Sequence, residues 1–244
     1  MAIVTVLRDQ ETLATAAAER VTALAVAAIA ARRRASLCLS GGQTPRRLYE
    51  LLADPSRPWR APVDWTRVHV FWGDERPVPP DHPESNFGMA YRALLANVPI
   101  PADQIHRLRG ELADAAEAAR EYEMVLSGAA MFDVLLLGLG EDGHIASVFP
   151  GSPLLSPDVI NRVAAVWVNQ LNARRITLTP PALLAARVLL VLVSGAGKAA
   201  AVGAALEGPE DVSRWPAQLL RAAGTRVEWL IDSAAAQRLD APPA

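Results

Sequence analysis

The sequence predicts a single-domain α/β protein with a doubly wound, mostly parallel sheet and helices on both faces. Short strand-like runs alternate with helix-like segments along the chain, which is the pattern of a parallel sheet with crossover helices. Several runs are apolar at consecutive positions, as expected of strands covered on both faces. Three runs end in glycine-rich loops, and such sheets bind ligands at the carboxyl ends of their strands.

The expected strands cover residues 3–7, 37–40, 68–72, 134–137, 163–168, 188–193 and 227–231. The expected helices cover residues 9–33, 45–52, 85–97, 111–127, 196–206 and 213–222, where starting residues and apolar spacing favour helix. Proline-rich stretches at 55–62 and 77–83 are short and flanked by further elements, so we interpret them as loops and not as domain linkers. Residues 1–244 are therefore expected to form one domain.

The composition argues against several classes of partner. The chain has 51% hydrophobic and 20% charged residues, a net charge of −2 and a pI near 6.1, so it offers no general attraction for nucleic acid or an anionic membrane. Its start lacks the pattern of a signal peptide, and its longest apolar run, 21–31, is too short to span a bilayer. We expect a cytoplasmic protein, either a monomer or a weak homo-oligomer. The single cysteine, Cys38, allows no internal disulfide and is expected to be a buried thiol.

The loop after the strand at 37–40 reads Ser40-Gly41-Gly42-Gln43-Thr44-Pro45. Thr44 suits an N-cap and Pro45 suits the first helical turn, so the loop leads into a helix amino terminus with free N–H groups. Such a site favours an anion, above all a phosphate. An ordinary strand-to-helix turn explains the loop equally well when it is taken alone.

Two carboxylates and a guanidinium, Asp74-Glu75-Arg76, follow the strand at 68–72. A solvated salt-bridge loop is an equal alternative. The position at the end of a strand favours function, and the helix start at Ser85-Asn86 allows the intervening proline-rich loop to fold over a site.

An acid and a histidine, Asp142 and His144, lie in the glycine loop after the strand at 134–137. The glycines happen to match a dinucleotide fingerprint, but Pro150 interrupts the helix that this fingerprint requires, and the next strand ends at Asn169 instead of an acid. A histidine two residues from an aspartate is suited to general-base work. The remaining histidines show no ligand spacing with it, so no metal site is expected.

Two further basic motifs are Arg174-Arg175-Ile-Thr177 and Ser194-Gly195-Ala-Gly197-Lys198. Of 24 basic residues, only Lys198 is a lysine, and a compact ammonium on a flexible stem suits a phosphate. Chance or plain surface explains each motif alone. Together with the Ser40 loop they form a candidate sugar-phosphate cradle.

With SGGQTP, FWGDERPVPPDHPESN, GLGEDGHIASVFPGS, RRITLT and SGAGKAAAV in this order, the chain resembles the 6-phosphogluconolactonases, which are related to glucosamine-6-phosphate deaminases. The resemblance implies a Rossmann-like fold and the hydrolysis of 6-phospho-D-glucono-1,5-lactone to 6-phospho-D-gluconate in the oxidative pentose phosphate pathway, with no cofactor.

The resemblance also implies roles for individual residues. His144 would be the general base, Asp142 would orient it, and Arg76 would stabilise an oxyanion or bind substrate oxygens. The residues that would hold the phosphate are Ser40, Gly41, Gly42, Thr44, Arg175 and Lys198. The small-molecule partner is then a sugar phosphate.

Two alternatives remain. The deaminases resemble this chain at DGHIA, but they carry a glutamate before the proline where this chain has Phe149, and a tyrosine at the position of Arg76. Losing the glutamate removes a proton-handling group that lactone hydrolysis does not need. The second alternative, a non-catalytic sugar-phosphate sensor, usually requires an output module, and the sequence shows none.

Overall fold

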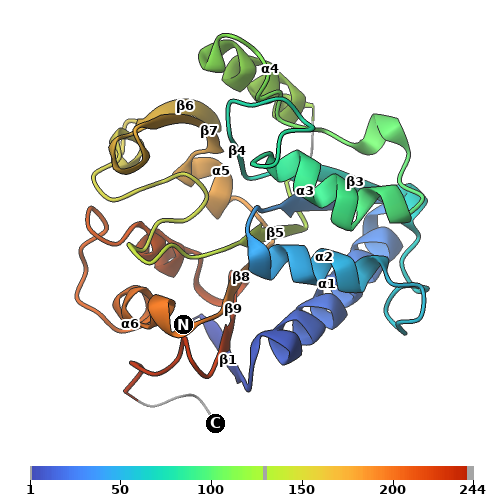
Figure 1. Cartoon of the computed structure of the whole chain (residues 1–244), viewed down its shortest axis with the longest axis horizontal. Helices are drawn as coiled ribbons and strands as arrows, with labels where there is room; N and C mark the ends of the chain where they lie inside the picture. The colour runs from blue at the N-terminus through green and yellow to red at the C-terminus, as the bar shows by residue number, and fades with distance from the viewer. Residues whose placement is uncertain (1, 129–130, 241–244) are drawn as a thin grey trace.

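A six-stranded, wholly parallel sheet forms the centre of the computed structural model, which describes residues 2–128 and 131–240 (Figure 1). Its strand order is β1-β9-β8-β5-β2-β3. The strands are β1 (Ile3–Leu7), β2 (Ala35–Leu39), β3 (Val68–Trp72), β5 (Val134–Leu137), β8 (Val188–Val193) and β9 (Val227–Asp232). From β2 the chain continues to β3 at one edge, whereas from β5 it continues through β8 and β9 toward the other, so the winding direction reverses between β2 and β5.

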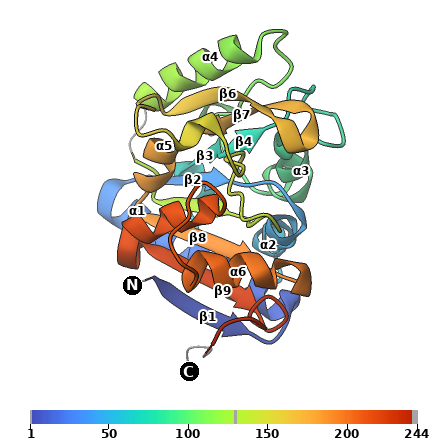
Figure 2. The same cartoon turned by 90° about the vertical axis from the view of Figure 1, so that its left-hand side faces the viewer.

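Helices cover both faces of this sheet, as predicted (Figures 1 and 2). One face packs against α1 (Gln10–Arg32), α2 (Gln43–Ala53) and α3 (Asn86–Ala93). The other packs against α4 (Ala115–Ser127), α5 (Pro180–Leu184), α6 (Ala199–Leu206) and the 3-10 segment η7 (Pro216–Arg226). Alternate residues of β5 enter the two cores: Val134 and Leu136 the first, Leu135 and Leu137 the second. This is why the strand is apolar at every position.

Helix α1 accounts for the long alanine-rich segment near the start of the chain. The Asp9 side chain accepts the Thr12 N–H at 2.8 Å, and Thr12 Oγ1 accepts the Asp9 N–H, which completes a capping box. Helix α1 has 23 residues and a mean hydropathy of 1.5, so by length and composition alone it could cross a membrane. The apolar run predicted at 21–31 is shorter than this helix. Part of its apolar surface is nevertheless covered by the protein, because residues such as Leu13, Ala17 and Val21 are buried in the core.

A second, three-stranded antiparallel sheet corrects one prediction. It has the order β4-β7-β6, from β4 (Asp74–Glu75), β6 (Val163–Val168) and β7 (Ala173–Leu178). The strand at 163–168 was expected in the main sheet. Only four residues separate β6 from β7, and so short a connection permits antiparallel pairing alone. Strand β7 and helix α5 were not predicted.

Elements differ from the prediction in four further places. Helix α2 begins at Gln43, so Gly42 is its N-cap and Thr44 lies in the first turn, which makes the predicted Thr44 cap wrong. The Ser85 cap is confirmed, since its side chain accepts the Gly88 N–H at 3.0 Å, although α3 ends at Ala93. The helix expected from residue 111 starts at Ala115, and the one expected at 213–222 is the 3-10 segment η7.

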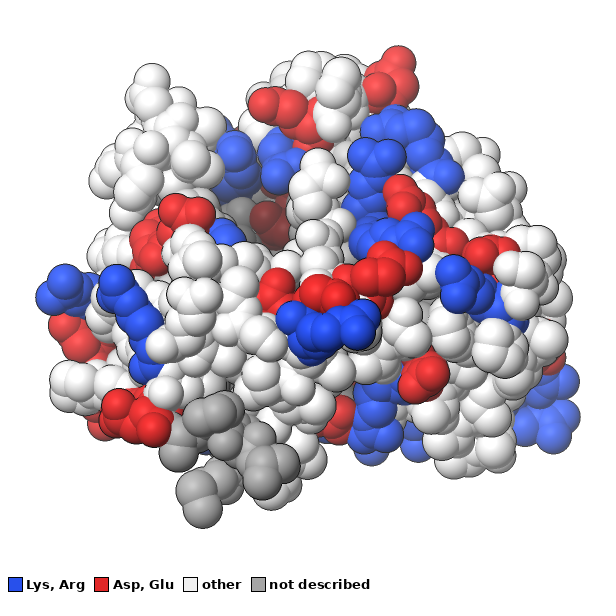
Figure 3. All heavy atoms as spheres, turned by 60° about the horizontal axis from the view of Figure 1, so that its bottom comes forward, with Lys and Arg blue, Asp and Glu red and all other residues white. Residues whose placement is uncertain are grey.

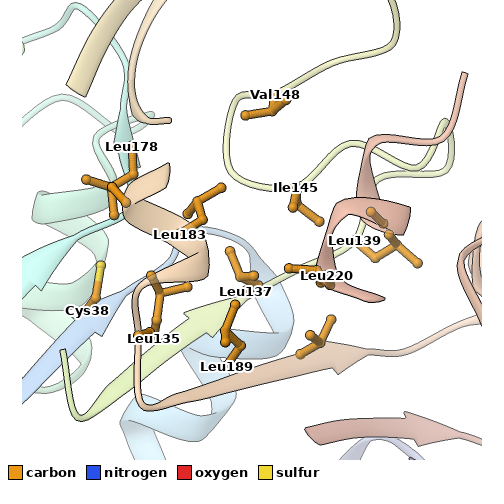
Figure 4. Packing of buried hydrophobic residues seen from close by; sticks show 14 of the residues in the cluster. Cys38, Leu135, Leu137, Leu139, Ile145, Val148, Leu178, Leu183, Leu189 and Leu220 are labelled. Carbon is orange, nitrogen blue, oxygen red and sulfur yellow. The ribbon is translucent and has the colours of Figure 1, made fainter. Parts of the chain in front are cut away.

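The core between the two sheets anchors the glycine loop that follows β5 (Figure 4). Ile145 and Val148 of this loop are fully buried in the same cluster as Leu137 of β5 and Leu178 of β7. Burial of such side chains stabilises by about 1.5–3 kcal/mol each, so the loop is fixed directly after His144. Cys38 is buried, as predicted. On the face in Figure 3 acidic and basic side chains intermingle, in keeping with the small net charge.

Candidate active site

A cavity of about 410 Å³ lies at the carboxyl ends of β2, β5 and β8, where the sheet order reverses. Seven of the nine predicted site residues line it: Ser40, Gly41, Gly42, Thr44, Arg76, His144 and Lys198. Asp142 and Arg175 do not line it. Its other polar lining residues include Gln10, Gln43, Asp74, Asn86 and Ser194. The structure therefore brings together, in one cavity, motifs that lie more than 150 residues apart in sequence.

Asp142 lies behind His144 and orients its ring. The Asp142 Oδ1 atom is 2.6 Å from His144 Nδ1 and also accepts the His144 backbone N–H at 3.2 Å. A carboxylate only accepts hydrogen bonds, so Nδ1 carries the proton and Nε2 keeps its lone pair. Because His144 lines the cavity and is 30% exposed, this lone pair belongs to the part of the ring that is free to act as a base.

One face and one edge of the imidazole are also confined. Phe149, itself only 6% exposed, stacks on one face with ring centroids 4.0 Å apart and planes inclined by 21°. Gly140 lies against the ring edge near Nδ1, where a side chain would collide with both His144 and Asp142. At the sequence position of the deaminase glutamate, this chain therefore has a side chain that packs on the base and has no ionisable group.

Gly143 allows this loop to turn between the acid and the histidine. Its φ is +80°, and a side chain there would meet the Trp215 ring at 2.7 Å, so both backbone and space require glycine. Its carbonyl accepts the Ala217 N–H at 2.9 Å. The loop is therefore tied to η7 on the side opposite the cavity.

The Ser40 loop has the geometry of an anion site. The Tyr49 hydroxyl of α2 accepts the Ser40 N–H at 2.9 Å and donates to the Ser40 carbonyl at 2.8 Å, which fixes the end of β2. Burial raises the pKa of Tyr49 well above its usual value, so the hydroxyl keeps its proton and remains a donor to the Ser40 carbonyl. Gly42 adopts a φ of +104°, and no side chain caps the amino terminus of α2. Its first N–H groups stay available to a ligand in the cavity.

Lys198 approaches the cavity from the loop after β8. The buried Asp232 carboxylate accepts the Ser194 hydroxyl at 2.6 Å and the Gly195 N–H at 3.0 Å, and so holds the loop. Gly195 has a φ of +101°. Across residues 2–128 and 131–240, no carboxylate forms an ion pair with Lys198. Its charge is available to an anion.

The opposite side of the cavity combines an acid, an amide and a guanidinium. Asp74 accepts the Asn86 amide at 3.1 Å and the Ser147 hydroxyl at 2.7 Å, which links β4 to α3 and to the His144 loop. The Arg76 guanidinium donates to the Glu84 carbonyl. The sequence predicted no individual role for Asp74 or Asn86, although both lie in motifs that carry the family resemblance.

Arg175 lies outside the cavity lining. It extends from β7, and its guanidinium donates to the Arg174 carbonyl at 2.8 Å. Burial and the nearby charge of Arg76 lower the pKa of Arg175, which places it on the Arg76 side of the site. The described residues contain no group of three or more His, Cys, Asp and Glu side chains able to hold a metal ion.

The fold and this cavity define an α/β protein with an oriented base and an anion cradle at the edge of a parallel sheet. The family model for glucosamine-6-phosphate isomerases/6-phosphogluconolactonase matches residues 8–229, and the chain belongs to this family. A 6-phosphogluconolactonase of Synechocystis sp. is 39% identical, covering 97% of this chain and 98% of the relative.

Solved structures agree with this assignment. The 6-phosphogluconolactonase of Trypanosoma brucei has a TM-score of 0.85 at 29% identity, covering 98% of this chain and 99% of that one. A monomeric glucosamine-6-phosphate deaminase has a TM-score of 0.83 at 25% identity, covering 96% and 99%. The predicted α/β fold and family are confirmed. Since both activities occur on this fold, the residues of the cavity must decide between them.

Proposed function

We propose that this protein hydrolyses 6-phospho-D-glucono-1,5-lactone to 6-phospho-D-gluconate. The observation that carries the proposal is the setting of His144: Asp142 on Nδ1, Phe149 on one face and a cavity with an anion cradle in front. This geometry suits a reaction that needs one base and one bound phosphate. Sequence relatives 39% and 40% identical that are 6-phosphogluconolactonases support the same reaction.

In the proposed mechanism the phosphate binds to the amino terminus of α2 and to Lys198, and the lactone lies between His144 and Arg76. His144 Nε2 takes a proton from a water molecule as the water oxygen attacks the lactone carbonyl. The Arg76 guanidinium stabilises the negative charge that develops on the carbonyl oxygen, or binds neighbouring substrate oxygens. Asp142 stabilises the imidazolium that forms.

The tetrahedral intermediate then collapses. The bond between the carbonyl carbon and the ring oxygen breaks, and the imidazolium returns its proton to the departing ring oxygen. The products are a carboxylic acid, which ionises in solution, and the free hydroxyl of the opened chain. Each proton taken by His144 is thus returned within one turnover, and no step uses a metal or an organic cofactor.

Phe149 distinguishes this proposal from deamination. Its sequence position is that of the deaminase glutamate, and its ring stacks on the imidazole. Among the residues described, no carboxylate other than Asp142 hydrogen-bonds to His144. We therefore expect no ring-opening and isomerisation of glucosamine 6-phosphate. The phosphate role of Arg175, the cytoplasmic location and the monomeric or weakly oligomeric state remain predictions.

A two-substrate assay tests the proposal. The purified protein is given freshly made 6-phosphogluconolactone, with acid release followed above the spontaneous background, and separately glucosamine 6-phosphate, with ammonia release followed. We expect acid release and no ammonia. Ammonia release would overturn the lactonase assignment, and binding of 6-phosphogluconate with neither activity would identify a sensor.

A further inference from the structure

Glu75 has no role in the mechanism above, yet it is the most buried carboxylate near the site, at 2% exposure. Its Oε1 atom accepts the N–H groups of Arg76 and Asn86, both at 2.8 Å. Its Oε2 atom accepts the Phe87 N–H at 2.8 Å and the Ser85 hydroxyl at 3.0 Å. One carboxylate therefore satisfies four donors.

These four donors come from the two ends of one loop. Arg76 begins the proline-rich segment 77–84, and Ser85, Asn86 and Phe87 form the start of α3. Hydrogen bonds to a carboxylate are stronger than those between neutral groups, so Glu75 closes the loop at its base. Burial raises the pKa of Glu75, while its backbone donors act in the opposite direction.

The backbone of the loop that Glu75 closes packs closely against two glycines, Gly88 and Gly110. A side chain at Gly88 would collide with the Pro80 carbonyl, and one at Gly110 would collide with the Arg76 carbonyl. The backbone of Arg76 is thus held between Gly110 on one side and Glu75 on the other. Its guanidinium is in turn held by the Glu84 carbonyl at the far end of the same loop.

Asn86 links Glu75 to a second part of the cavity. Its backbone N–H is fixed by Glu75, and its side-chain amide donates to the Asp74 carbonyl at 2.9 Å and to Asp74 Oδ1 at 3.1 Å. Its amide oxygen lies so close to Gly41 that any side chain at that position would collide with it. Glu75 is therefore in contact with two residues that line the cavity from opposite ends of one loop.

We propose that Glu75 is a positioning residue that holds Arg76 and Asn86 against the substrate by closing the 76–87 loop. The inference rests on the proposed lactone hydrolysis, because its principal readout is kcat. A displacement of about 1 Å in a substrate-positioning group costs on the order of 100-fold in rate. Among the described residues, Glu75 forms no hydrogen bond with α2 or Lys198, where the phosphate is proposed to bind, so kcat should fall more than KM rises.

The test uses Glu75→Ala, Glu75→Gln and the control Glu228→Gln. Glu228 is another buried glutamate, 8% exposed, that pairs with Arg20 and does not line the cavity. Steady-state rates are measured on folded protein, and amide hydrogen exchange is followed in peptides covering 74–90. We expect kcat to fall about 100-fold in Glu75→Ala and about 10-fold in Glu75→Gln, since glutamine keeps one accepting oxygen. The amides of Arg76, Asn86 and Phe87 should exchange faster, and Glu228→Gln should retain the wild-type kcat.

Wild-type kcat in folded Glu75 variants would overturn the inference, as would unchanged amide exchange in the loop. If Glu75→Ala does not fold, Glu75→Gln decides by the same two measurements. Failure of the proposed function is a separate result, because it appears as absent lactone hydrolysis by the wild-type protein, whereas loop exchange is measured without substrate.

Discussion

At the scale of single residues, the site depends on how firmly one imidazole is held. Asp142 fixes the Nδ1 side of His144, Phe149 covers one face, and Gly140 leaves room at the edge. The sequence predicted Asp142 and His144 from their spacing in a glycine loop. It did not predict the stacking of Phe149, because four residues of irregular loop separate it from His144 and their path depends on the buried Ile145 and Val148.

Replacing Phe149 by leucine tests this confinement. The change keeps an apolar side chain but removes the aromatic stacking, which is worth about 0.5–1.5 kcal/mol. We expect kcat for lactone hydrolysis to fall about 2- to 10-fold, with KM little changed because Phe149 touches the base and not the phosphate cradle. Phe132→Leu is the matched control, since Phe132 is also 6% exposed but packs on Phe71 away from the cavity. Equal kcat values for the two variants would refute the role of Phe149.

At the scale of elements, the site lies at the carboxyl ends of β2, β5 and β8 and at the amino terminus of α2. All six strands of the main sheet could be predicted, five at their observed first residue and β2 two residues late, because continuous apolar runs are distinctive. The small antiparallel sheet could not be anticipated. Strand β7 reads ARRITL, with two adjacent arginines near its start, so its sequence lacks the apolar signal of a core strand.

Lys198, in the loop after β8, contributes one positive charge to the proposed phosphate cradle. Lys198→Ala should raise KM for the lactone about 10- to 100-fold, because a charge-assisted hydrogen bond contributes about 1.5–3 kcal/mol, and should change kcat less. Lys198→Arg keeps the charge and serves as the control, with a smaller rise in KM. The measurement is a saturation curve for each variant, and an unchanged KM in Lys198→Ala would remove the lysine from the phosphate cradle.

At the scale of the whole molecule, the edge of the main sheet at β3 contains a histidine pair. His69 of β3 and His106 are 3.1 Å apart between Nδ1 and Nε2, and His106 also stacks on Phe71 at 4.5 Å. The His106 N–H donates to the Val70 carbonyl at 2.8 Å, which joins this segment to the edge strand. The pair thus contributes to global stability at a distance from the cavity.

This pair predicts a loss of stability in mild acid. Burial lowers the pKa of both histidines below the usual 6.5, with further contributions from Arg34 at His69 and from His69 at His106. The folded state therefore binds fewer protons than the unfolded state near this pH, so the stabilisation is complete above about pH 6.5 and is lost as pH falls through the folded-state values. His106→Phe keeps the stacking and removes one titration.

Denaturant unfolding at about pH 7.5 and about pH 5.5 measures this effect. The free energy of unfolding should fall more between the two pH values in the wild type than in His106→Phe. An identical pH dependence in the two proteins would show that the pair does not set acid stability. Catalytic residues play no part in this measurement.

The whole account depends most directly on His144 as the general base. The decisive measurement is the steady-state rate of 6-phosphogluconolactone hydrolysis by His144→Ala, corrected for spontaneous hydrolysis and compared with the wild type. Loss of a general base costs about 100- to 10,000-fold in rate, so kcat should fall by that factor while KM stays within a few-fold. Hydrolysis by His144→Ala at the wild-type rate would contradict the account.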